Sequence, residues 1–330
     1  MITAEYIWLD GTPSMPQLRS KTRRVEKDSP LPEWGFDGGS TLQSGIHDSD
    51  LILKPVRSYK DPFREEGVLV MCEVLNQDGT PHSTNHRSQL EVSVGATEND
   101  MWFGFEQEYT LLTGQKQPVA WAYGRLKPIS QGDFYCGVGA YKIYHRDLVD
   151  KHFEYCLKAG ISMYGLNAEV MPGQWEFQTG PSTALQAADD LWVARYILDR
   201  IFEPEFTLVS YHPKPEVGFN GAGCHTNFST SSMREDYHYC VEAINRLSSR
   251  HELHMDEYGE DNHLRMTGDC ETSDYDKFTV GETDRSCSIR VPIHVKKANK
   301  GYLEDRRPAA NIDPYRVCDR LIKSVCLDED

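Results

Sequence analysis

Two acidic side chains placed two residues apart in an apolar stretch constrain this chain more than any other feature. Glu106 and Glu108 alternate with Phe105, Gln107 and Tyr109. Because residues i and i+2 of a β-strand point the same way, this spacing predicts a strand with both carboxylates on one face. Two such carboxylates repel each other, so a partly buried pair must be protonated or neutralised by a cation. No basic residue lies beside them, and the pattern therefore predicts a bound metal ion.

A second acidic pair flanks a predicted turn. Residues 161–170 and 174–178 read as two strands, and the Met-Pro-Gly sequence between them is typical of a tight turn. A hairpin formed in this way would bring Glu169 close to Glu176.

The same alternation recurs twice further along the chain. His225, Asn227 and Ser229 would share one strand face, and Glu304 and Arg306 would share another. Each acidic pair taken alone is more typical of a solvated strand face, but the recurrence favours a metal site. Oxygen-rich sites with one imidazole suit Mg²⁺ or Mn²⁺ and not a structural zinc ion.

Arginines crowd the last quarter of an otherwise acidic chain, namely Arg265, Arg285, Arg290, Arg306 and Arg307. Guanidinium groups match the oxygens of phosphate and carboxylate, which indicates phosphoryl chemistry on an anionic substrate. Arg285 and Arg290 lie five residues apart, so a straight strand would send them to opposite faces. The alternative interpretation is a set of surface arginines that pair with the abundant acids.

Composition excludes several classes of protein. The net charge of −16 argues against a general surface for nucleic acids or anionic membranes. The longest apolar stretches are interrupted by charges, so we expect no membrane span, and the first residues lack a basic secretory signal. The nine cysteines include no CxxC pair and do not resemble a disulfide framework. We therefore expect a cytoplasmic protein with reduced thiols.

The pattern of elements predicts a small β-rich domain followed by mixed structure. Strands are expected at residues 4–9, 18–25 and 68–75, and the polar residues 81–100 show no convincing periodicity. Further along, helices are expected at residues 147–159, 182–202, 234–258 and 313–326, and a strand at residues 287–295.

Several motifs together resemble glutamine synthetases of the eukaryotic-like type II class, and among these the animal-type enzymes most. The matching stretches are residues 4–8, 34–41, 103–110, 167–178, 220–230, 265–272, 285–292 and 301–308. The resemblance implies an α+β fold. A β-grasp domain would span residues 1–80, a connecting segment residues 81–100, and a catalytic domain, like that of ATP:guanido phosphotransferases, residues 101–330. An antiparallel sheet would form the active-site funnel.

The resemblance also implies roles for individual residues. It divides the predicted metal ligands between two ions. Glu108, Glu169 and Glu176 would bind the ion beside glutamate and ammonia. Glu106, His225 and Glu304 would bind the ion that bridges the ATP phosphates. The implied substrate-binding residues are Asn220, Gly221, Arg265, Arg290 and Glu169, the implied ATP-binding residues are Ser229, Arg285 and Arg290, and the implied catalytic residues are Asp37, Glu271, Arg285 and Arg306.

The implied reaction is the ATP-dependent ligation of ammonia to L-glutamate through γ-glutamyl phosphate, with two or three Mg²⁺ or Mn²⁺ ions per site. The implied assembly is a decamer of two pentameric rings, in which Asp37 serves the site of a neighbouring subunit. Cys270 and Asp284 depart from the family pattern, and the stretch 120–135 is shorter than in many members. Two alternatives stay open, an inactive structural or regulatory descendant and a ligase for another amine or acid.

Overall fold

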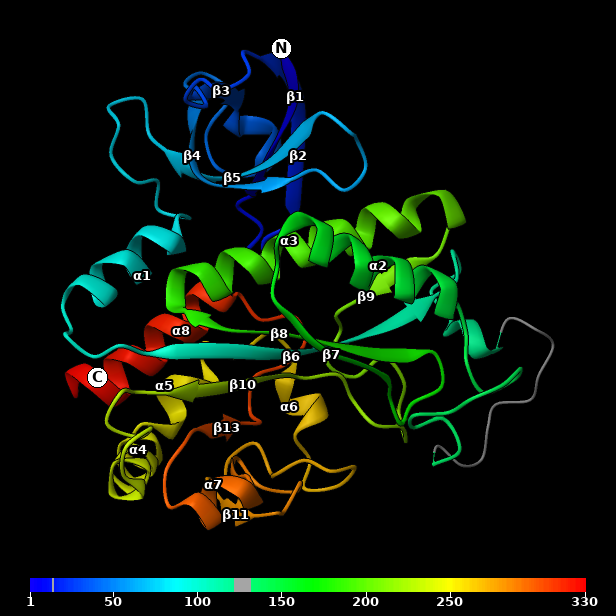
Figure 1. Cartoon of the computed structure of the whole chain (residues 1–330), viewed down its shortest axis with the longest axis vertical. Coiled ribbons are helices and arrows are strands. Elements are labelled where there is room, and N and C mark those ends of the chain that lie inside the picture. The colour runs from blue at the N-terminus through cyan, green and yellow to red at the C-terminus, as the bar shows by residue number, and fades with distance from the viewer. Residues whose placement is uncertain (14, 122–131) are drawn as a thin grey trace.

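The computed structural model describes residues 1–13, 15–121 and 132–330 (Figure 1). Most of the stretch expected to be shorter than in related chains, residues 122–131, lies outside the described residues. The described part of the chain is an α+β structure, as predicted, with a small sheet at the N-terminus and a larger sheet in the rest of the chain.

The small sheet is built from the first 75 residues. Its order is β2-β1-β5-β4-β3, and all neighbours are antiparallel except β1 and β5. A 3₁₀ turn at Gly38–Thr41 follows β3. The strands are β1 Ile2–Leu9, β2 Leu18–Val25, β3 Trp34–Asp37, β4 Asp50–Lys60 and β5 Gly67–Leu75.

Strand β1 has two buried faces, and its five consecutive buried residues include one charged side chain, Glu5. Tyr6 and Trp8 pack in the core of the small sheet, whereas Ile7 belongs to the larger core. On that second face Glu5 accepts a hydrogen bond from Tyr196 of helix α3, Ala184–Phe202. Helix α3 therefore lies between the two sheets and fixes one against the other (Figure 1).

The larger sheet has the order β11-β12-β13-β10-β6-β8-β7, and β9 pairs with the far end of β6. Its pairs are antiparallel except β11 with β12. The central position of β6 brings the predicted acidic strand into the middle of the sheet. The strands are β6 Trp102–Leu112, β7 Met163–Ala168, β8 Gln174–Thr183, β9 Leu208–Ser210, β10 Cys224–Ser229, β11 Val280–Glu282, β12 Ile289–Val291 and β13 Leu303–Asp305.

Helices cover this sheet on the side that faces the small domain, where α1, α2, α3 and α8 lie (Figure 1). A one-turn π-helix, Lys323–Leu327, extends α8. Besides α3, the helices are α1 His86–Gly95, α2 Arg146–Ala159, α4 Tyr237–Ser249, α5 His251–Met255, α6 Asn262–Arg265, α7 Ile293–Ala298 and α8 Pro314–Ile322, with short 3₁₀ turns at Val119–Trp121 and Glu203–Glu205.

Most predicted elements are confirmed. Strands β1, β2 and β5, the β7–β8 hairpin and helices α2, α3 and α8 lie where the patterns place them, with one or two residues of difference at most ends. Gly160 ends α2 in the left-handed conformation, at φ 94°. That conformation is the one in which glycine is favoured at a helix end.

Two predictions about elements are wrong, and one helix was not predicted. The expected helix 234–258 begins only at the Asp236 cap and breaks at Arg250, which leaves helical geometry. The expected strand 287–295 is only three residues long, because Pro292 caps α7. The segment 81–100 contains α1, whose buried residues, Arg87, Leu90 and Ser93, include only one apolar side chain. The division of the chain at residues 80 and 100 stays a prediction.

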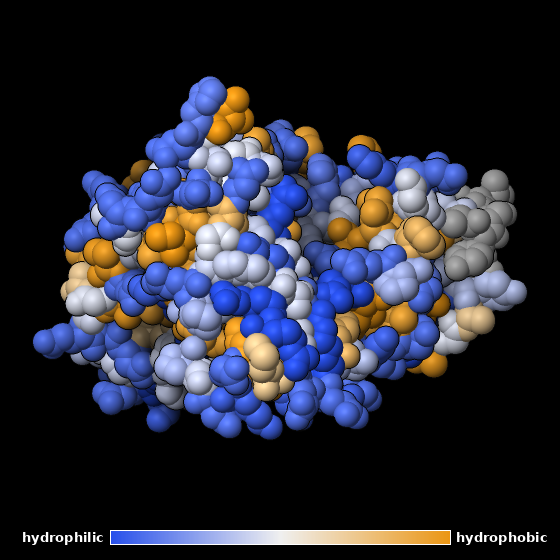
Figure 2. Space-filling model, turned by 90° about the horizontal axis from the view of Figure 1, so that it is seen from above, coloured by the Kyte–Doolittle hydropathy of each residue, from blue (hydrophilic) through white to orange (hydrophobic). Residues whose placement is uncertain are grey.

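Hydrophilic side chains cover most of the face seen in Figure 2, and hydrophobic residues form separate small patches there. This agrees with a mean hydropathy of −0.58. None of the helices in the described parts of the chain is long and apolar enough to cross a membrane.

Candidate active site

The centre of the large sheet brings the predicted acidic residues together through strand register. Glu106 on β6 lies opposite His225 on β10, and Glu108 on β6 lies opposite Glu176 on β8. Glu304 on β13 lies opposite Asn227, two residues along β10 from His225 and thus on the same face. The same-face prediction for Glu106 and Glu108 is confirmed, because Phe105, Gln107 and Tyr109 are fully buried on the other side.

Glu108, Glu169 and Glu176 form the first group, here called the carboxylate cluster. One carboxylate oxygen from each residue lies within 4.8 Å of the others. Burial raises the pKa of all three, that of Glu108 to about 8, and repulsion from neighbouring carboxylates adds to the effect. Their hydrogen-bond donors are neutral: the Gly223 amide serves Glu108 and the Gln178 side chain serves Glu176.

Glu106, His225 and Glu304 form the second group, here called the imidazole cluster, whose ligand atoms also lie within 4.8 Å of one another. His225 Nδ1 is 3.8 Å from Glu106 Oε2 and 3.7 Å from Glu304 Oε1. Burial and the nearby Arg306 lower the pKa of His225 well below its usual range. The imidazole is therefore neutral, which is the form that binds metal ions.

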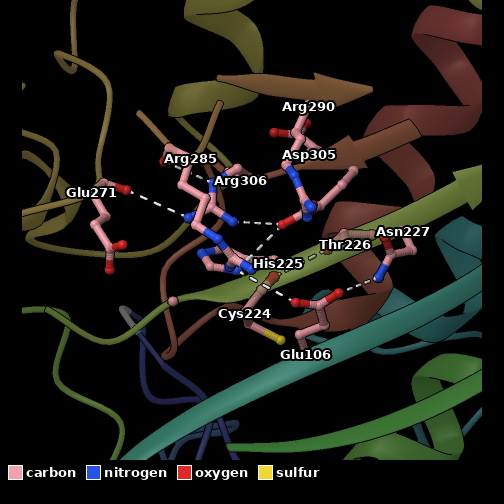
Figure 3. Close-up of polar contacts among 12 residues, drawn as sticks. Glu106, Cys224, His225, Thr226, Asn227, Glu271, Arg285, Arg290, Asp305 and Arg306 are labelled. Carbon is pink, nitrogen blue, oxygen red and sulfur yellow. Dashed lines mark hydrogen bonds and ion pairs between the residues drawn. The ribbon is translucent and has the colours of Figure 1, made fainter. Parts of the chain in front are cut away.

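Two arginines neutralise Glu304. Arg290 Nη1 donates to Glu304 Oε2 at 2.6 Å, and Arg306 Nη1 donates to Glu304 Oε1 at 2.6 Å. Figure 3 shows Arg285 and Arg306 between Glu271 and the Glu106–His225 pair. Arg285 and Arg290 are not related by a straight strand, since the chain turns through residues 283–288 before β12 begins.

A cavity of about 160 Å³ separates the two clusters from the loops above them. Gly221 forms part of its wall, and a Cβ added there would lie 2.4 Å from both Arg265 and the Pro213 carbonyl. Glycine at this position is therefore required by close approach. The described lining also includes Asn220, Arg265, Glu271, Arg285 and Arg306.

The loop that carries Glu271 reaches over this cavity. Cys270 and Glu271 both have positive φ angles, 54° and 60°, a conformation that costs free energy for residues other than glycine. Asn220 donates a hydrogen bond from Nδ2 to Glu271 Oε2 at 3.1 Å. This contact joins the loop to the opposite wall of the cavity.

A second cavity, of about 500 Å³, begins at Glu106 and extends along β10. Ser229 lies in its wall, and its hydroxyl accepts a hydrogen bond from Arg234. Tyr164 and Tyr302 provide flat apolar surface there. Glu106 and the strands β6 and β10 are thus shared between a small polar cavity and a larger, more apolar one.

Comparison with known proteins identifies the family. Residues 2–77 match the model of the β-grasp domain of glutamine synthetase, and residues 85–252 match the model of its catalytic domain. The chain belongs to the glutamine synthetase family. It is 50% identical to the glutamine synthetase of Agaricus bisporus over 99% of this chain and 94% of that protein. It is 48% identical to that of Saccharomyces cerevisiae over 98% of this chain and 89% of that protein. These eukaryotic relatives agree with the type II class.

One predicted residue of the glutamine synthetase site lies elsewhere. Asp37 is at the end of β3 in the small domain, where it is exposed and caps the following turn through the Gly39 amide and the Ser40 hydroxyl. Its neighbours Trp34 and Phe36 line a separate open depression on the small sheet. Within one chain, Asp37 is not part of either cluster.

Two predicted binding residues are partly occupied by the protein itself. Arg265 Nη2 donates to the carbonyls of Arg306, Arg307 and Pro308, which leaves Nη1 at the cavity side near Gly223. Burial lowers the pKa of Arg265 only to about 10, so it stays charged. Arg290 binds Glu304, as described above.

Sequence reasoning missed the amide side chains that support the clusters. Asn167 donates to Glu169 Oε1 at 2.9 Å, Gln178 donates to Glu176 Oε1 at 2.6 Å, and Gln174 donates to the Gly221 carbonyl at 3.0 Å. The alternation that joins Glu106 to Glu108 also joins Glu176 to Gln178, so the same rule would have found this residue.

The donor sets suit hard divalent cations. Two buried carboxylates and a partly buried one, without a charged hydrogen-bond donor among the described residues, favour a bound cation when all three ionise, and carboxylate oxygens are the preferred ligands of Mg²⁺ and Mn²⁺. The imidazole cluster adds one neutral nitrogen donor to two carboxylates. The residues present therefore fit such ions, and the assignment of individual ligands stays a prediction.

Proposed function

We propose that this chain catalyses the ATP-dependent ligation of ammonia to L-glutamate, with γ-glutamyl phosphate as the intermediate. The observation that carries the proposal is the placement of the two clusters on neighbouring positions of one strand, β6, with two arginines hydrogen-bonded to Glu304 of the imidazole cluster. Membership of the glutamine synthetase family supports the same reaction.

Two or three Mg²⁺ or Mn²⁺ ions would neutralise charge on the ATP phosphates and polarise the glutamate γ-carboxylate. Glu108, Glu169 and Glu176 would hold the ion on the glutamate side. Glu106, His225 and Glu304 would hold the ion on the nucleotide side. The second cavity, beside Glu106 and Ser229, is large enough for a base and ribose and would receive ATP.

Phosphoryl transfer requires positive charge around the transferring group. Arg285 and Arg306 lie at the small cavity and would bind the γ-phosphate oxygens. Arg290, released from Glu304 when cations and nucleotide bind, would add a third guanidinium. The acyl phosphate forms because a γ-carboxylate oxygen attacks the γ-phosphorus and ADP leaves.

Glutamate itself would be held by groups on the other side of the cavity. Asn220, Gly221 and Arg265 line that wall, and Nη1 of Arg265 points toward it. Glu271 would close over the intermediate through its contact with Asn220. Closure is chemically necessary, since water would hydrolyse an acyl phosphate.

Ammonium must lose a proton before its nitrogen can attack the acyl phosphate. We assign this step to Asp37 of a neighbouring subunit, in a decamer of two pentameric rings. Its exposed position on the small domain supports this assignment, because the carboxylate lies at the surface, where a neighbouring subunit can reach it. We also propose a cytoplasmic location, supported by nine cysteines that are all unpaired.

The deciding experiment measures phosphate release by the purified protein with Mg²⁺ and ATP. Release should require glutamate and ammonium together and should disappear in the Glu304→Ala variant. Release that is indifferent to either substrate contradicts the proposal. Release with another amine but not with ammonium would identify a ligase for that amine instead.

The shared site has its own test. Asp37→Ala and Glu304→Ala variants should each be inactive, and a mixture refolded or co-expressed together should recover part of the activity. Recovery requires that one subunit supplies Asp37 and another supplies Glu304. A mixture as inactive as its components, although it assembles to the size of the wild type, would contradict the shared site.

A further inference from the structure

We infer that Arg195 and Gln107, which lie behind the large sheet and touch neither cavity wall of the proposed reaction, are positioning residues for the two metal clusters. The inference rests on the proposed function, because it assumes that the clusters bind divalent ions. Helix α3 lies against the large sheet on the side that faces the small domain (Figure 1). Arg195 of this helix donates a hydrogen bond to Gln107 of β6.

Gln107 is the residue between Glu106 and Glu108, and its side chain is fully buried on the opposite face of β6. Its Oε1 accepts two hydrogen bonds from Arg195, from Nε at 2.9 Å and from Nη2 at 2.6 Å. Its Nε2 donates to the Glu108 carbonyl at 2.7 Å and to the Ala310 carbonyl at 3.0 Å. Both the oxygen and the nitrogen of this side chain are therefore hydrogen-bonded, the oxygen to Arg195 and the nitrogen to two backbone carbonyls.

Arg195 extends the contact to the segment that follows Glu304 and Arg306. Nη1 donates to the Ile312 carbonyl at 2.8 Å and Nη2 donates to the Ala310 carbonyl at 3.1 Å. The guanidinium lies against the rings of Trp192 and Tyr211, 4.7 and 5.1 Å from their centroids. The side chain is thus fixed by packing as well as by hydrogen bonds.

Residues 308–312 also hold β10, the strand that carries His225. The Ala310 amide donates to the Ala222 carbonyl, and the Cys224 amide donates to the Pro308 carbonyl. Residues 222–224 lead directly to His225. Arg195 and Gln107 consequently tie together the backbones that carry Glu106 and Glu108, His225, and Glu304, on the side away from the ligands.

The chemistry of Arg195 is unusual for a merely structural residue. It is fully buried, and its oxygen acceptors in the described part of the chain are the neutral side-chain oxygen of Gln107 and the carbonyls of Ala310 and Ile312, while the carboxyl of Asp199 interacts with it only through charge. A buried cation without a hydrogen-bonded carboxylate is costly, and apolar residues often replace buried charges without loss of stability. What an apolar residue cannot supply is the planar fork that fixes the distances between three backbone segments.

The test compares Arg195→Lys with a matched control, Arg87→Lys. Arg87 is also buried, and its planar guanidinium also makes two hydrogen bonds, from Nε and Nη2 to Asp189 at 2.9 and 3.1 Å. Among the described residues, none of its hydrogen bonds reaches a strand that carries a residue of the two clusters. Both variants keep the positive charge but lose the planar guanidinium group, which can donate several hydrogen bonds at once. Mn²⁺ binding is measured by titration of the metal-free proteins, and the unfolding midpoint is measured in EDTA.

We expect both variants to lose stability but only Arg195→Lys to bind Mn²⁺ more weakly, by about 10-fold or more, as is usual when residues that orient metal ligands are replaced. Equal Mn²⁺ affinity in wild type and Arg195→Lys would overturn the inference. So would an equal loss in Arg87→Lys, because the effect would then follow stability alone. Failure of the wild type itself to bind Mn²⁺ would instead contradict the proposed function.

Gln107→Glu provides a second variant in case Arg195→Lys does not fold. A carboxylate would pair with Arg195 but could not donate to the carbonyls of Glu108 and Ala310. Its added negative charge would by itself strengthen cation binding, so weaker Mn²⁺ binding would have to come from altered positions. Unchanged or tighter binding in this variant would count against the positioning role.

Discussion

The carboxylate cluster and the imidazole cluster use neighbouring positions of the same strand but balance their charge in opposite ways. Glu304 has a guanidinium on each oxygen. Glu108 and Glu176 receive hydrogen bonds from a backbone amide and a side-chain amide, and no lysine or arginine pairs with them among the described residues. The pKa of each carboxyl in the carboxylate cluster is raised as a result of burial and repulsion.

In the imidazole cluster, arginines of the protein neutralise the charge of a carboxylate. In the carboxylate cluster, this neutralisation depends more on a bound cation. A buried carboxylate that lacks a countercharge destabilises the fold until a cation binds. The contribution of the carboxylate cluster to stability should therefore depend more strongly on divalent ions than that of the imidazole cluster. The imidazole cluster should keep its shape without them, and its arginines become available for phosphate when cations take over their role.

The largest expected effect follows from the loss of charge at Glu304. In Glu304→Gln the two arginines lose their common carboxylate while the shape of the side chain is kept. Phosphate release should fall by about 10³-fold, since both a cation ligand and the arrangement of the phosphate-binding arginines are lost. The free energy of unfolding should fall by about 3 kcal/mol, because the buried Arg306 and the partly buried Arg290 lose their carboxylate partner. A variant as stable as the wild type in EDTA would break the comparison.

The matching change in the carboxylate cluster should have the opposite effect on stability. Glu176→Gln removes one of three mutually repelling carboxyls, so the metal-free protein should gain roughly 1 to 2 kcal/mol near neutral pH. It should also bind Mn²⁺ much more weakly. Denaturant unfolding in EDTA and Mn²⁺ titration measure the two effects. If Glu176→Gln and Glu304→Gln change the free energy of unfolding in the same direction, the protein does not neutralise the charges of the two clusters in different ways.

The pH dependence of the metal-free protein should show the same contrast. Glu108 has its pKa raised from 4.5 to about 8, so between these values the folded protein holds a proton that the unfolded chain has released. Stability is therefore complete below pH 4.5 and declines as pH rises toward 8. We expect a decline of roughly 1 to 3 kcal/mol in EDTA and a much smaller one with saturating Mg²⁺, which displaces the protons.

The Glu108→Gln variant is the control for this dependence, because other buried acids also contribute. Burial raises the pKa of Asp190 to about 6, for example. The difference between wild type and Glu108→Gln isolates the cluster. A difference that does not change with pH in EDTA would show that Glu108 is already ionised in the folded state.

Local patterns account for the parts of the fold and site that the sequence predicts. The alternation around Glu106 and Glu108 gives the strand and its faces, and the turn at residues 171–173 gives the hairpin that carries Glu176. Local patterns do not predict helix α1, because its buried Arg87 forms a hydrogen bond with Asp189 of α3, about a hundred residues away in the chain. A periodicity rule counts that arginine as exposed.

The assembly of the clusters depends on register across four strands, which spacing cannot supply. Glu304 joins Glu106 and His225 only because β13 pairs with β10, and irregularities in β6 and β7 shift the pairing by a residue. The family resemblance supplied this grouping in advance, and the structure adds its physical cause. Neither source indicated Gln107 and Arg195, whose role depends on contacts to backbone carbonyls that leave no trace in residue type.

The smallest expected effect concerns Glu106, the least buried carboxylate of the imidazole cluster. Asn227 donates from Nδ2 to Glu106 Oε1 at 2.8 Å, and no arginine in the described part of the chain forms an ion pair with Glu106. Asn227→Ala should weaken Mn²⁺ binding to the imidazole cluster, the second event of a titration, by about 1.5 kcal/mol, roughly tenfold, as expected for one hydrogen bond to a charged group. Asn167→Ala, which removes the donor to Glu169, should weaken the other event by a similar amount. If each variant shifts both events equally, the clusters are coupled so strongly that they act as one site.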